Sequence, residues 1–163
     1  MIGIILNDRI GNTSIENIDM TANKLLLMTS NVVLSANKKN YESLKNYFKE
    51  KENIQVISEH GEFQNCGALT DVYSASCQFP KMTDFLTLST KYCNLNQEVI
   101  STLADNQNSY AVTTTNSFYT ISHFSIDQEN LVPYLNLENF SFKDFIVDEL
   151  QCLPITFVKS DID

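Results

Sequence analysis

The stretch Asn31–Ser58, NVVLSANKKNYESLKNYFKEKENIQVIS, decides the fold class of this chain. It opens with Val32–Leu34, a short apolar run of the kind found in buried strands. Apolar residues then recur at the spacing of a helix: Tyr41, Leu44 and Phe48. A second apolar run, Ile54–Ile57, follows a polar break. This order of strand, helix and strand predicts a βαβ unit, whose two strands pair in parallel through a right-handed crossover.

Length and composition indicate one globular domain, residues 1–163. Of the 163 residues, 43% are hydrophobic and 10% aromatic, which is enough for a single continuous core. The net charge of −9 argues against nucleic acid as a partner, because phosphate binding needs a basic surface. No apolar run is long enough to cross a membrane, and Met1–Leu6 is too short and lacks the basic start of a secretion signal. We therefore expect a cytoplasmic protein that binds neither nucleic acid nor membranes.

Cysteines and histidines give no signature of a metal site or of nucleophilic catalysis. The four cysteines show no paired spacing: Cys66, Cys77, Cys93 and Cys152. We therefore expect reduced thiols and no bound metal. The two histidines, His60 and His123, are far apart in the sequence, so the fold itself would have to assemble any catalytic pair.

Apolar runs and capping residues outside the opening stretch continue the alternation of strands and helices. Further strands are expected at Ile2–Leu6, Asp84–Ser89, Ser109–Thr115, Phe118–Phe124 and Leu153–Lys159. Helices are expected to begin after Ser14 or Asn17, at Thr70-Asp71, and after Asn94 or Asn96. Ile126–Glu138 shows no regular pattern. The order predicts an α/β fold with a mixed, mostly parallel sheet, helices on both faces and an antiparallel edge formed by the last strands.

Three runs, Val32–Leu34, Ile54–Ile57 and Asp84–Ser89, are expected to be parallel strands in the centre of the sheet. Ligands of such sheets bind beyond the carboxyl ends of the strands. The loops in which to look for a site are therefore Asn7–Ser14, Ser35–Lys39, Ser58–Gly61 and Ser89–Asn96. The chain has four glycines and none after Gly67, so no glycine-rich phosphate-binding motif can be written for it.

Several segments, taken in order, resemble the dihydrofolate reductase family. MIGIILNDRIG resembles its first strand and the loop behind it, and NVVLSANKKNYESL resembles a strand, the cofactor loop and a helix. DFLTLST, NQEVISTLADNQNSYAVTTT and LPITFVKS resemble later strands and a helix of that family. The resemblance covers nearly the full chain. It implies a single-domain, dihydrofolate-reductase-like mixed sheet flanked by helices.

The resemblance also implies a set of site residues. Asp19 matches the acid that anchors the pterin ring and helps to protonate it, and Thr113 matches the threonine that hydrogen-bonds this acid. Lys38 and Lys39 fall in the cofactor loop, where they would meet a phosphate of NADPH. Ser89-Thr90 replaces the paired glycines beside the cofactor pyrophosphate, and Cβ atoms there would crowd it. Asp19 and the two lysines are also typical of a solvated helix start without any such function.

Departures from the family pattern favour a loss of catalysis. Ser89-Thr90 would weaken NADPH binding, and the chain has no tryptophan to match the one in the family's loop over the pterin. We therefore predict a degenerate dihydrofolate-reductase-like domain without a cofactor, serving as a non-catalytic binding or structural component of a larger assembly. The alternatives are an NADPH-dependent reductase of dihydrofolate or a related pterin, and a pterin- or nucleotide-binding regulator without turnover.

A protein partner at residues 126–145 is part of the same prediction. This segment carries more large apolar residues than an edge region needs: Leu131, Val132, Tyr134, Leu135, Leu137, Phe140, Phe142 and Phe145. An exposed patch of this kind is typical of a partner site. The alternative is that the same side chains pack under the sheet as core.

Overall fold

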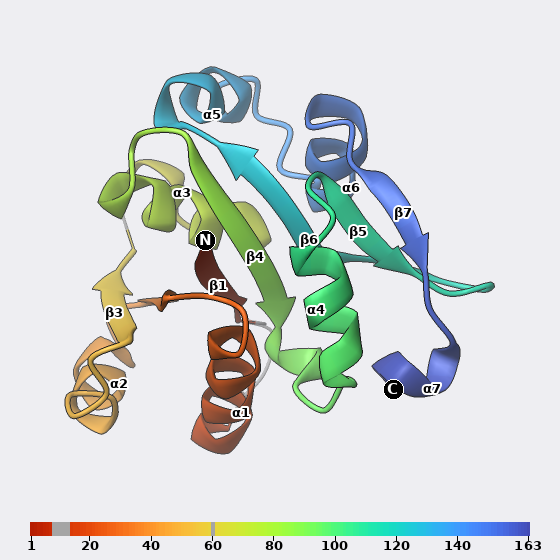
Figure 1. The fold of residues 1–163 in the computed structure, drawn as a ribbon. Helices are drawn as coiled ribbons and strands as arrows, with labels where there is room; N and C mark the ends of the chain where they lie inside the picture. The colour runs from red at the N-terminus through yellow and green to blue at the C-terminus, as the bar shows by residue number, and fades with distance from the viewer. Residues whose placement is uncertain (8–13, 60) are drawn as a thin grey trace.

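The computed structural model describes residues 1–7, 14–59 and 61–163, which form a seven-stranded mixed sheet with helices on both faces (Figure 1). The strands lie in the order β3-β2-β1-β4-β6-β5-β7. Their bounds are β1 Ile2–Leu6, β2 Asn31–Ala36, β3 Ile54–Ser58, β4 Thr83–Ser89, β5 Ser109–Val112, β6 Ser117–Ile126 and β7 Leu153–Thr156. The helices are α1 Ile15–Leu26, α2 Tyr41–Tyr47, α3 Ala68–Gln78, α4 Gln97–Ala104, α5 Gln128–Leu135, α6 Phe142–Asp144 and α7 Lys159–Ile162. The predicted α/β class is confirmed.

The βαβ unit of the opening stretch is confirmed. β2 and β3 pair in parallel, with Val32 opposite Ile54, and α2 connects them. β1 pairs in parallel with β2 on one side and with β4 on the other. β2 and β4 are interior strands, but β3 lies at the edge of the sheet, so the central position expected for Ile54–Ile57 is wrong. Its exposed Gln55 and Ser58 fit an edge, because a strand covered on both faces would bury them.

The antiparallel strand of the sheet, β6, lies in its interior and not at an edge. β6 runs antiparallel to both of its neighbours, β4 and β5. β7, at the far edge, pairs in parallel with β5, so the expected antiparallel edge is wrong. A tight turn joins β5 to β6, in which the backbone N–H of Thr113 donates to the carbonyl of Asn116 at 2.8 Å. Such a turn can only connect antiparallel strands, whereas the parallel strand β7 needs the long connection through α5 and α6.

Side chains alternate between the two faces of the sheet and form one apolar layer on each face. Ile4 and Val33 contribute to the layer that packs against α3 and α5. Ile5 and Leu34 contribute to the layer that packs against α1, α2 and α4. Burial of one large apolar side chain stabilises the fold by about 1.5–3 kcal/mol. These layers hold the carboxyl ends of β1, β2 and β3 in fixed positions.

Two helix starts follow the predicted capping residues. The Ser14 hydroxyl accepts a hydrogen bond from the backbone N–H of Asn17 at 3.1 Å and caps α1. The Asn96 side chain accepts one from the N–H of Glu98 at 3.0 Å and caps α4. The sequence-based helix starts are confirmed at both places.

The segment Ile126–Glu138 is not irregular, because it contains α5. Asp127 caps this helix by accepting a hydrogen bond from the N–H of Asn130 at 2.8 Å. Pro133 lies within the helix, and proline disfavours a helix interior, which explains why the sequence did not indicate one. The strand expected over Leu153–Lys159 is also too long, since β7 ends at Thr156 and α7 follows.

The large apolar residues of segment 126–145 divide into buried and exposed groups. Leu131, Tyr134, Leu135 and Phe145 are buried in the core. Leu137 and Phe140 are exposed, with 75% and 38% of their surface accessible. The predicted protein partner at this segment therefore depends on these exposed side chains and stays a prediction. No helix in the described part of the chain is long and apolar enough to cross a membrane.

Candidate functional site

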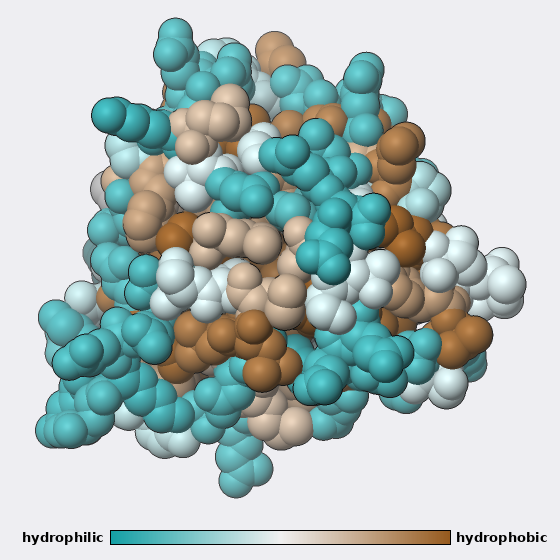
Figure 2. All heavy atoms as spheres, viewed as in Figure 1, coloured by the Kyte–Doolittle hydropathy of each residue, from teal (hydrophilic) through white to brown (hydrophobic). Residues whose placement is uncertain are grey.

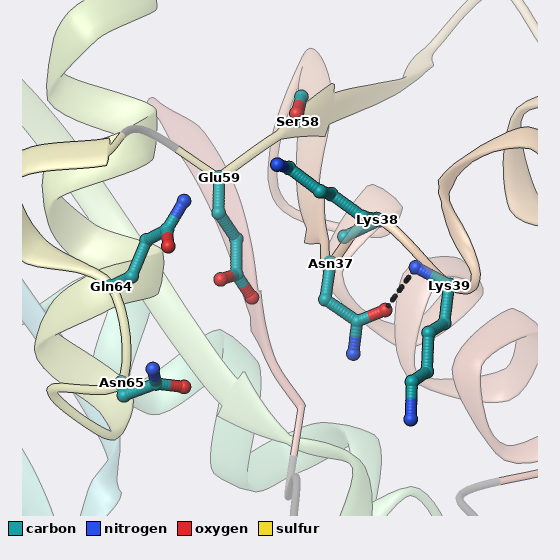
Figure 3. Close-up of a pocket in the computed structure, with 8 residues that line it drawn as sticks. Asn37, Lys38, Lys39, Ser58, Glu59, Gln64 and Asn65 are labelled. Carbon is teal, nitrogen blue, oxygen red and sulfur yellow. Dashed lines mark hydrogen bonds between the residues drawn. The ribbon is translucent and has the colours of Figure 1, made fainter.

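A pocket of about 370 Å³ opens beyond the carboxyl ends of β2 and β3 (Figure 3). Its lining comes from the ends of the two strands, the loop before α2 and the loop before α3: Ala36, Asn37, Lys38, Lys39, Ser58, Glu59, Gln64 and Asn65. Pockets of roughly 300–1,000 Å³ are typical of small-molecule sites. The carboxyl edge of parallel strands is also where α/β sheets bind their ligands.

Asn37 shapes the wall that carries the two lysines. Its side-chain oxygen accepts hydrogen bonds from the backbone N–H groups of Lys39, at 3.0 Å, and Asn40, at 3.1 Å. Asparagine favours this local turn because its short side chain reaches the backbone two residues further on. The turn places Lys38 and Lys39 side by side before α2, and both side chains are exposed. Figure 3 shows Lys38 extending toward Ser58.

The facing wall is made of polar side chains from the loop before α3. Gln64 and Asn65 lie across the pocket from Asn37, with the Glu59 side chain between them (Figure 3). Asn65 has a φ of 60°, in the left-handed region that asparagine tolerates better than most residues. Amide side chains both donate and accept hydrogen bonds, so this wall can pair with a polar ring edge.

A buried hydrogen bond supports the floor of the pocket. The Ser35 hydroxyl donates to the carboxylate of Asp71, and both residues are almost fully buried. Ser35 immediately precedes Ala36 at the end of β2, and Asp71 lies in the first turn of α3. The bond therefore fixes α3, and the loop that carries Gln64 and Asn65, against the strand that carries the lysines.

The charge of the pocket lining suits an anion. Lys38 and Lys39 bring two positive charges to a lining that contains one carboxylate, Glu59. Lysine ammonium groups are common ligands of phosphate. Within the described ranges, no three His, Cys, Asp or Glu side chains lie close enough to hold a metal ion.

Asp19 and Thr113, predicted as a catalytic pair, bond to other residues. The Asp19 carboxylate forms an ion pair with Lys51 on the surface between α1 and the end of α2. The Thr113 hydroxyl accepts a hydrogen bond from the backbone N–H of Asn116 at 3.2 Å, in the turn between β5 and β6. Neither residue lines the pocket.

Of the residues predicted to meet a cofactor, the structure brings two into the pocket. Lys38 and Lys39 line it. Ser89 and Thr90 lie at the end of β4, where the Ser89 hydroxyl accepts a hydrogen bond from the N–H of Lys91 at 3.3 Å and Thr90 is buried. The loop after β1 and His60 lie outside the described residues, so nothing is assigned to them.

Gln64 and Asn65 were missed from the sequence. Glu59 falls within Ser58–Gly61, a loop singled out because it follows a strand, but Gln64 and Asn65 lie beyond it. Isolated amides in a polar loop have no spacing signature. The short turn Gly61–Phe63, anchored by buried Phe63, is what returns the chain to the pocket.

Comparisons with known proteins give a match in structure only. No family model and no curated protein matches the sequence. Among solved structures, the chain is similar to that of a 4-diphosphocytidyl-2C-methyl-D-erythritol synthase, with a TM-score of 0.67 and 10% sequence identity. The match covers 99% of this chain and 90% of that one. At this identity the likeness shows the fold alone.

This match overturns the resemblance to the dihydrofolate reductases. The segments that suggested it are short strand and helix patterns that many α/β chains share, and they do not determine which strands become neighbours. The functions inferred from it, a non-catalytic dihydrofolate-reductase-like component or an NADPH-dependent reductase of dihydrofolate, are wrong for the same reason. The fold of this chain is instead similar to that of the synthase.

Proposed function

We propose that this chain binds a nucleotide in the pocket at the carboxyl ends of β2 and β3. The observation that carries the proposal is the pairing of two lysines on one wall with amide side chains on the other, across about 370 Å³. A nucleotide has the matching polarity, with an anionic phosphate chain at one end and a planar base bearing donors and acceptors at the other.

The phosphate end of the ligand is assigned to Lys38 and Lys39. Both residues line the pocket from consecutive positions in a loop held by Asn37. Figure 3 shows the Lys38 side chain extending toward Ser58 and the Lys39 side chain extending in another direction, so the two charges are assigned to different oxygens of the phosphate chain. They contact phosphate oxygens as point charges, because the chain has no glycine-rich loop among the pocket residues to supply a backbone cradle. Hydrogen bonds to charged groups contribute about 1.5–3 kcal/mol each.

The base end is assigned to Gln64 and Asn65. Each amide offers donors and an acceptor to a base edge. Glu59 lies between the two ends and can accept a hydrogen bond from a ribose hydroxyl or an exocyclic amino group. The name of the structurally similar synthase contains a diphosphocytidyl group, which makes cytidine nucleotides the first ligands to test.

Isothermal titration of the protein with CTP, CDP and cytidine tests the proposal. We expect CTP to bind and cytidine to bind at least about tenfold more weakly, because it lacks the phosphates that the lysines contact. The variant Lys38→Ala/Lys39→Ala should lose about tenfold or more in affinity for CTP. The matched control is Lys81→Ala/Lys143→Ala, which removes the same charge from exposed positions outside the pocket and should bind CTP normally.

Two results would contradict nucleotide binding at this pocket. One is the absence of saturable heat with CTP, UTP, ATP and GTP at concentrations up to about 1 mM. The other is equal weakening of CTP binding by both double variants, which would mean that net charge, not the pocket, attracts the nucleotide.

Transfer of the nucleotidyl group is a second candidate function, favoured by the fold match over 99% of the chain. In this reaction an acceptor phosphate oxygen bonds to the α-phosphorus of CTP, and the bond to the β-phosphate breaks to release pyrophosphate. Release of pyrophosphate only when CTP and a sugar or polyol phosphate are both present would support transfer. If CTP binds but no pyrophosphate is released with any acceptor phosphate tested, the chain binds nucleotides without transferring them.

A further inference from the structure

The outer edge of β3 has no neighbouring strand in the described part of the sheet (Figure 1). A groove of about 320 Å³ runs along this edge, between β3 and α2. Its lining residues are Asn31, Lys45, Phe48, Lys49, Lys51, Glu52, Ile54, Gln55 and Val56. The groove shares no residue with the nucleotide pocket, which lies at the other end of β3.

Hydrogen bonds to β2 reveal which backbone groups of β3 face outward. The N–H of Val32 donates to the carbonyl of Asn53 at 2.8 Å, and the N–H of Glu59 donates to the carbonyl of Ala36 at 3.1 Å. The backbone N–H and C=O groups of the odd-numbered residues of β3 therefore face β2. The backbone groups of the next residue along a strand face the opposite edge, so those of the even-numbered residues face outward. Val56 and Ser58 thus present their N–H and C=O groups on the outer edge, where an added strand would pair.

Lysines give the rim of the groove a positive charge. Lys45 lies in α2, and Lys49 lies in the turn that follows this helix. Both side chains are exposed and form no ion pair within the described ranges. Lys51 is paired with Asp19, and Glu52 is the one carboxylate of the lining. Figure 2 shows hydrophilic side chains over this part of the molecule, at its lower left. The rim is therefore basic in a chain whose net charge is −9.

Apolar side chains form the floor of the same groove. Phe48 is 2% exposed, and Val56 is half-buried between α2 and the open edge. An added strand would lie over this floor with every second side chain on the α2 side, because side chains alternate between the faces of a sheet. Acidic residues at those alternate positions would reach Lys45 and Lys49.

We propose that the outer edge of β3 binds an extended, acidic segment of a protein partner, which adds to the sheet as an eighth strand beside the seven described. The open backbone groups of Val56 and Ser58 supply the pairing, and the basic rim selects the charge of the segment. A nucleic acid fits this site less well, because it has no peptide N–H and C=O groups to pair with a strand edge. The proposal does not require a bound nucleotide, and of Val56 and Ser58 only Ser58 also lines the nucleotide pocket.

Labelled peptides test the proposal on the intact protein. The probe is a fluorescent peptide in which Glu and Val alternate, and its control is the same peptide with Pro at every Val. Both carry the same charge, but proline cannot donate to a strand ladder. We expect the Glu–Val peptide to bind at least about tenfold more tightly than the Glu–Pro peptide. It should also slow hydrogen exchange at the amides of Val56 and Ser58.

A pair of matched variants tests the role of the lysines. Lys45→Glu/Lys49→Glu should weaken binding of the Glu–Val peptide by about tenfold or more. Lys81→Glu/Lys143→Glu makes the same change in net charge at exposed positions away from the groove and should change binding less than about twofold.

Three outcomes would overturn the proposal: no saturable binding of the Glu–Val peptide up to about 1 mM, equal binding of the two peptides, or unchanged exchange at Val56 and Ser58 in the saturated complex. The exchange measurement reports on the edge itself, so the test does not depend on whether a variant folds.

Discussion

His123 donates a hydrogen bond from Nε2 to the Asp84 carboxylate at 2.8 Å, and this contact joins β6 to the neighbouring strand β4. The other ring nitrogen, Nδ1, lies 2.7 Å from the carbonyl oxygen of Leu103 in α4. Ser125 also donates to Asp84, at 2.9 Å. The side chain of His123 is 3% exposed, so it connects α4 to the sheet from within the core.

Replacing this histidine should destabilise the fold. His123→Leu removes the hydrogen bond to the Asp84 carboxylate and the contact with the Leu103 carbonyl, and we expect a loss of about 1–3 kcal/mol in the free energy of unfolding. A double-mutant cycle with Asp84→Asn, followed by urea denaturation, isolates the pair. A coupling energy of zero would mean that the carboxylate, which is 36% exposed, is satisfied by water.

The buried pair of Ser35 and Asp71 should be equally sensitive. Ser35→Ala removes a donor from a carboxylate that is 1% exposed, so the free energy of unfolding should fall by about 1–3 kcal/mol. Ser35→Thr keeps the hydroxyl and serves as the control. Because the pair supports the floor of the pocket, the alanine variant should also bind CTP more weakly. An unchanged urea midpoint would show that the bond contributes nothing.

The ion pair of Asp19 with Lys51 should contribute little. The two side chains are 25% and 42% exposed, and solvent screens such pairs to less than about 1 kcal/mol. Asp19→Asn should therefore leave both the melting temperature and CTP binding nearly unchanged. A large loss of CTP binding in this variant would place Asp19 in the site and contradict the pocket assigned above.

Tyr134 and Leu137 offer a test of core against surface in segment 126–145. Tyr134 is 8% exposed, and its ring centroid lies 5.3 Å from that of Phe145. Tyr134→Asp should cost about 3 kcal/mol or more, because it opens a cavity and buries a carboxylate. Leu137→Asp, at a residue 75% exposed, should stay within about 0.5 kcal/mol of wild type. Loss of association with another protein in the Leu137 variant would support the partner predicted for this segment.

Stability should fall in alkaline solution, in part through Cys152. Burial raises the pKa of this thiol from its ordinary value of 9.0 to about 11. Between these values the folded chain keeps a proton that the unfolded chain has lost. The contribution of this thiol to the free energy of unfolding is therefore fully present below pH 9 and is lost as pH rises toward about 11. Burial also raises the pKa of Cys77.

The measurement is the urea midpoint of the wild type and of Cys152→Ala across this range. The alanine variant is expected to start from a lower stability and to show a shallower fall with pH. Parallel curves for the two proteins would mean that Cys152 does not contribute to the alkaline loss of stability.

Local elements of the fold could be predicted, but their lateral order could not. Val32–Leu34 and Ile54–Ile57 could be predicted as parallel strands. The two apolar runs and the helix between them are patterns that a short stretch of sequence shows by itself. The position of β6 between β4 and β5 depends on pairs such as Leu86 with His123, which are far apart in the sequence. The mistaken resemblance to the dihydrofolate reductases has the same cause. It took a similar order of strands and helices along the chain as evidence for the same arrangement of strands in the sheet.

Only some residues of the candidate site could be predicted from the sequence. Lys38 and Lys39 could be named from the sequence, since they follow a strand directly and carry the charge that a phosphate needs. Gln64 and Asn65 carry no charge and have no fixed spacing from any strand. Only the folded turn after β3 brings these amides opposite the lysines.

The central place of β1 in the sheet has a consequence during synthesis on the ribosome. β1 can pair with β2 as soon as Ala36 has emerged, but its other edge pairs with β4 and stays open until Ser89 has been made. During that interval the nascent chain exposes IGIIL as an unprotected apolar edge. Slow translation before residue 89 would therefore favour misassembly between nascent chains, and a chaperone that covers such edges would be needed most at this stage.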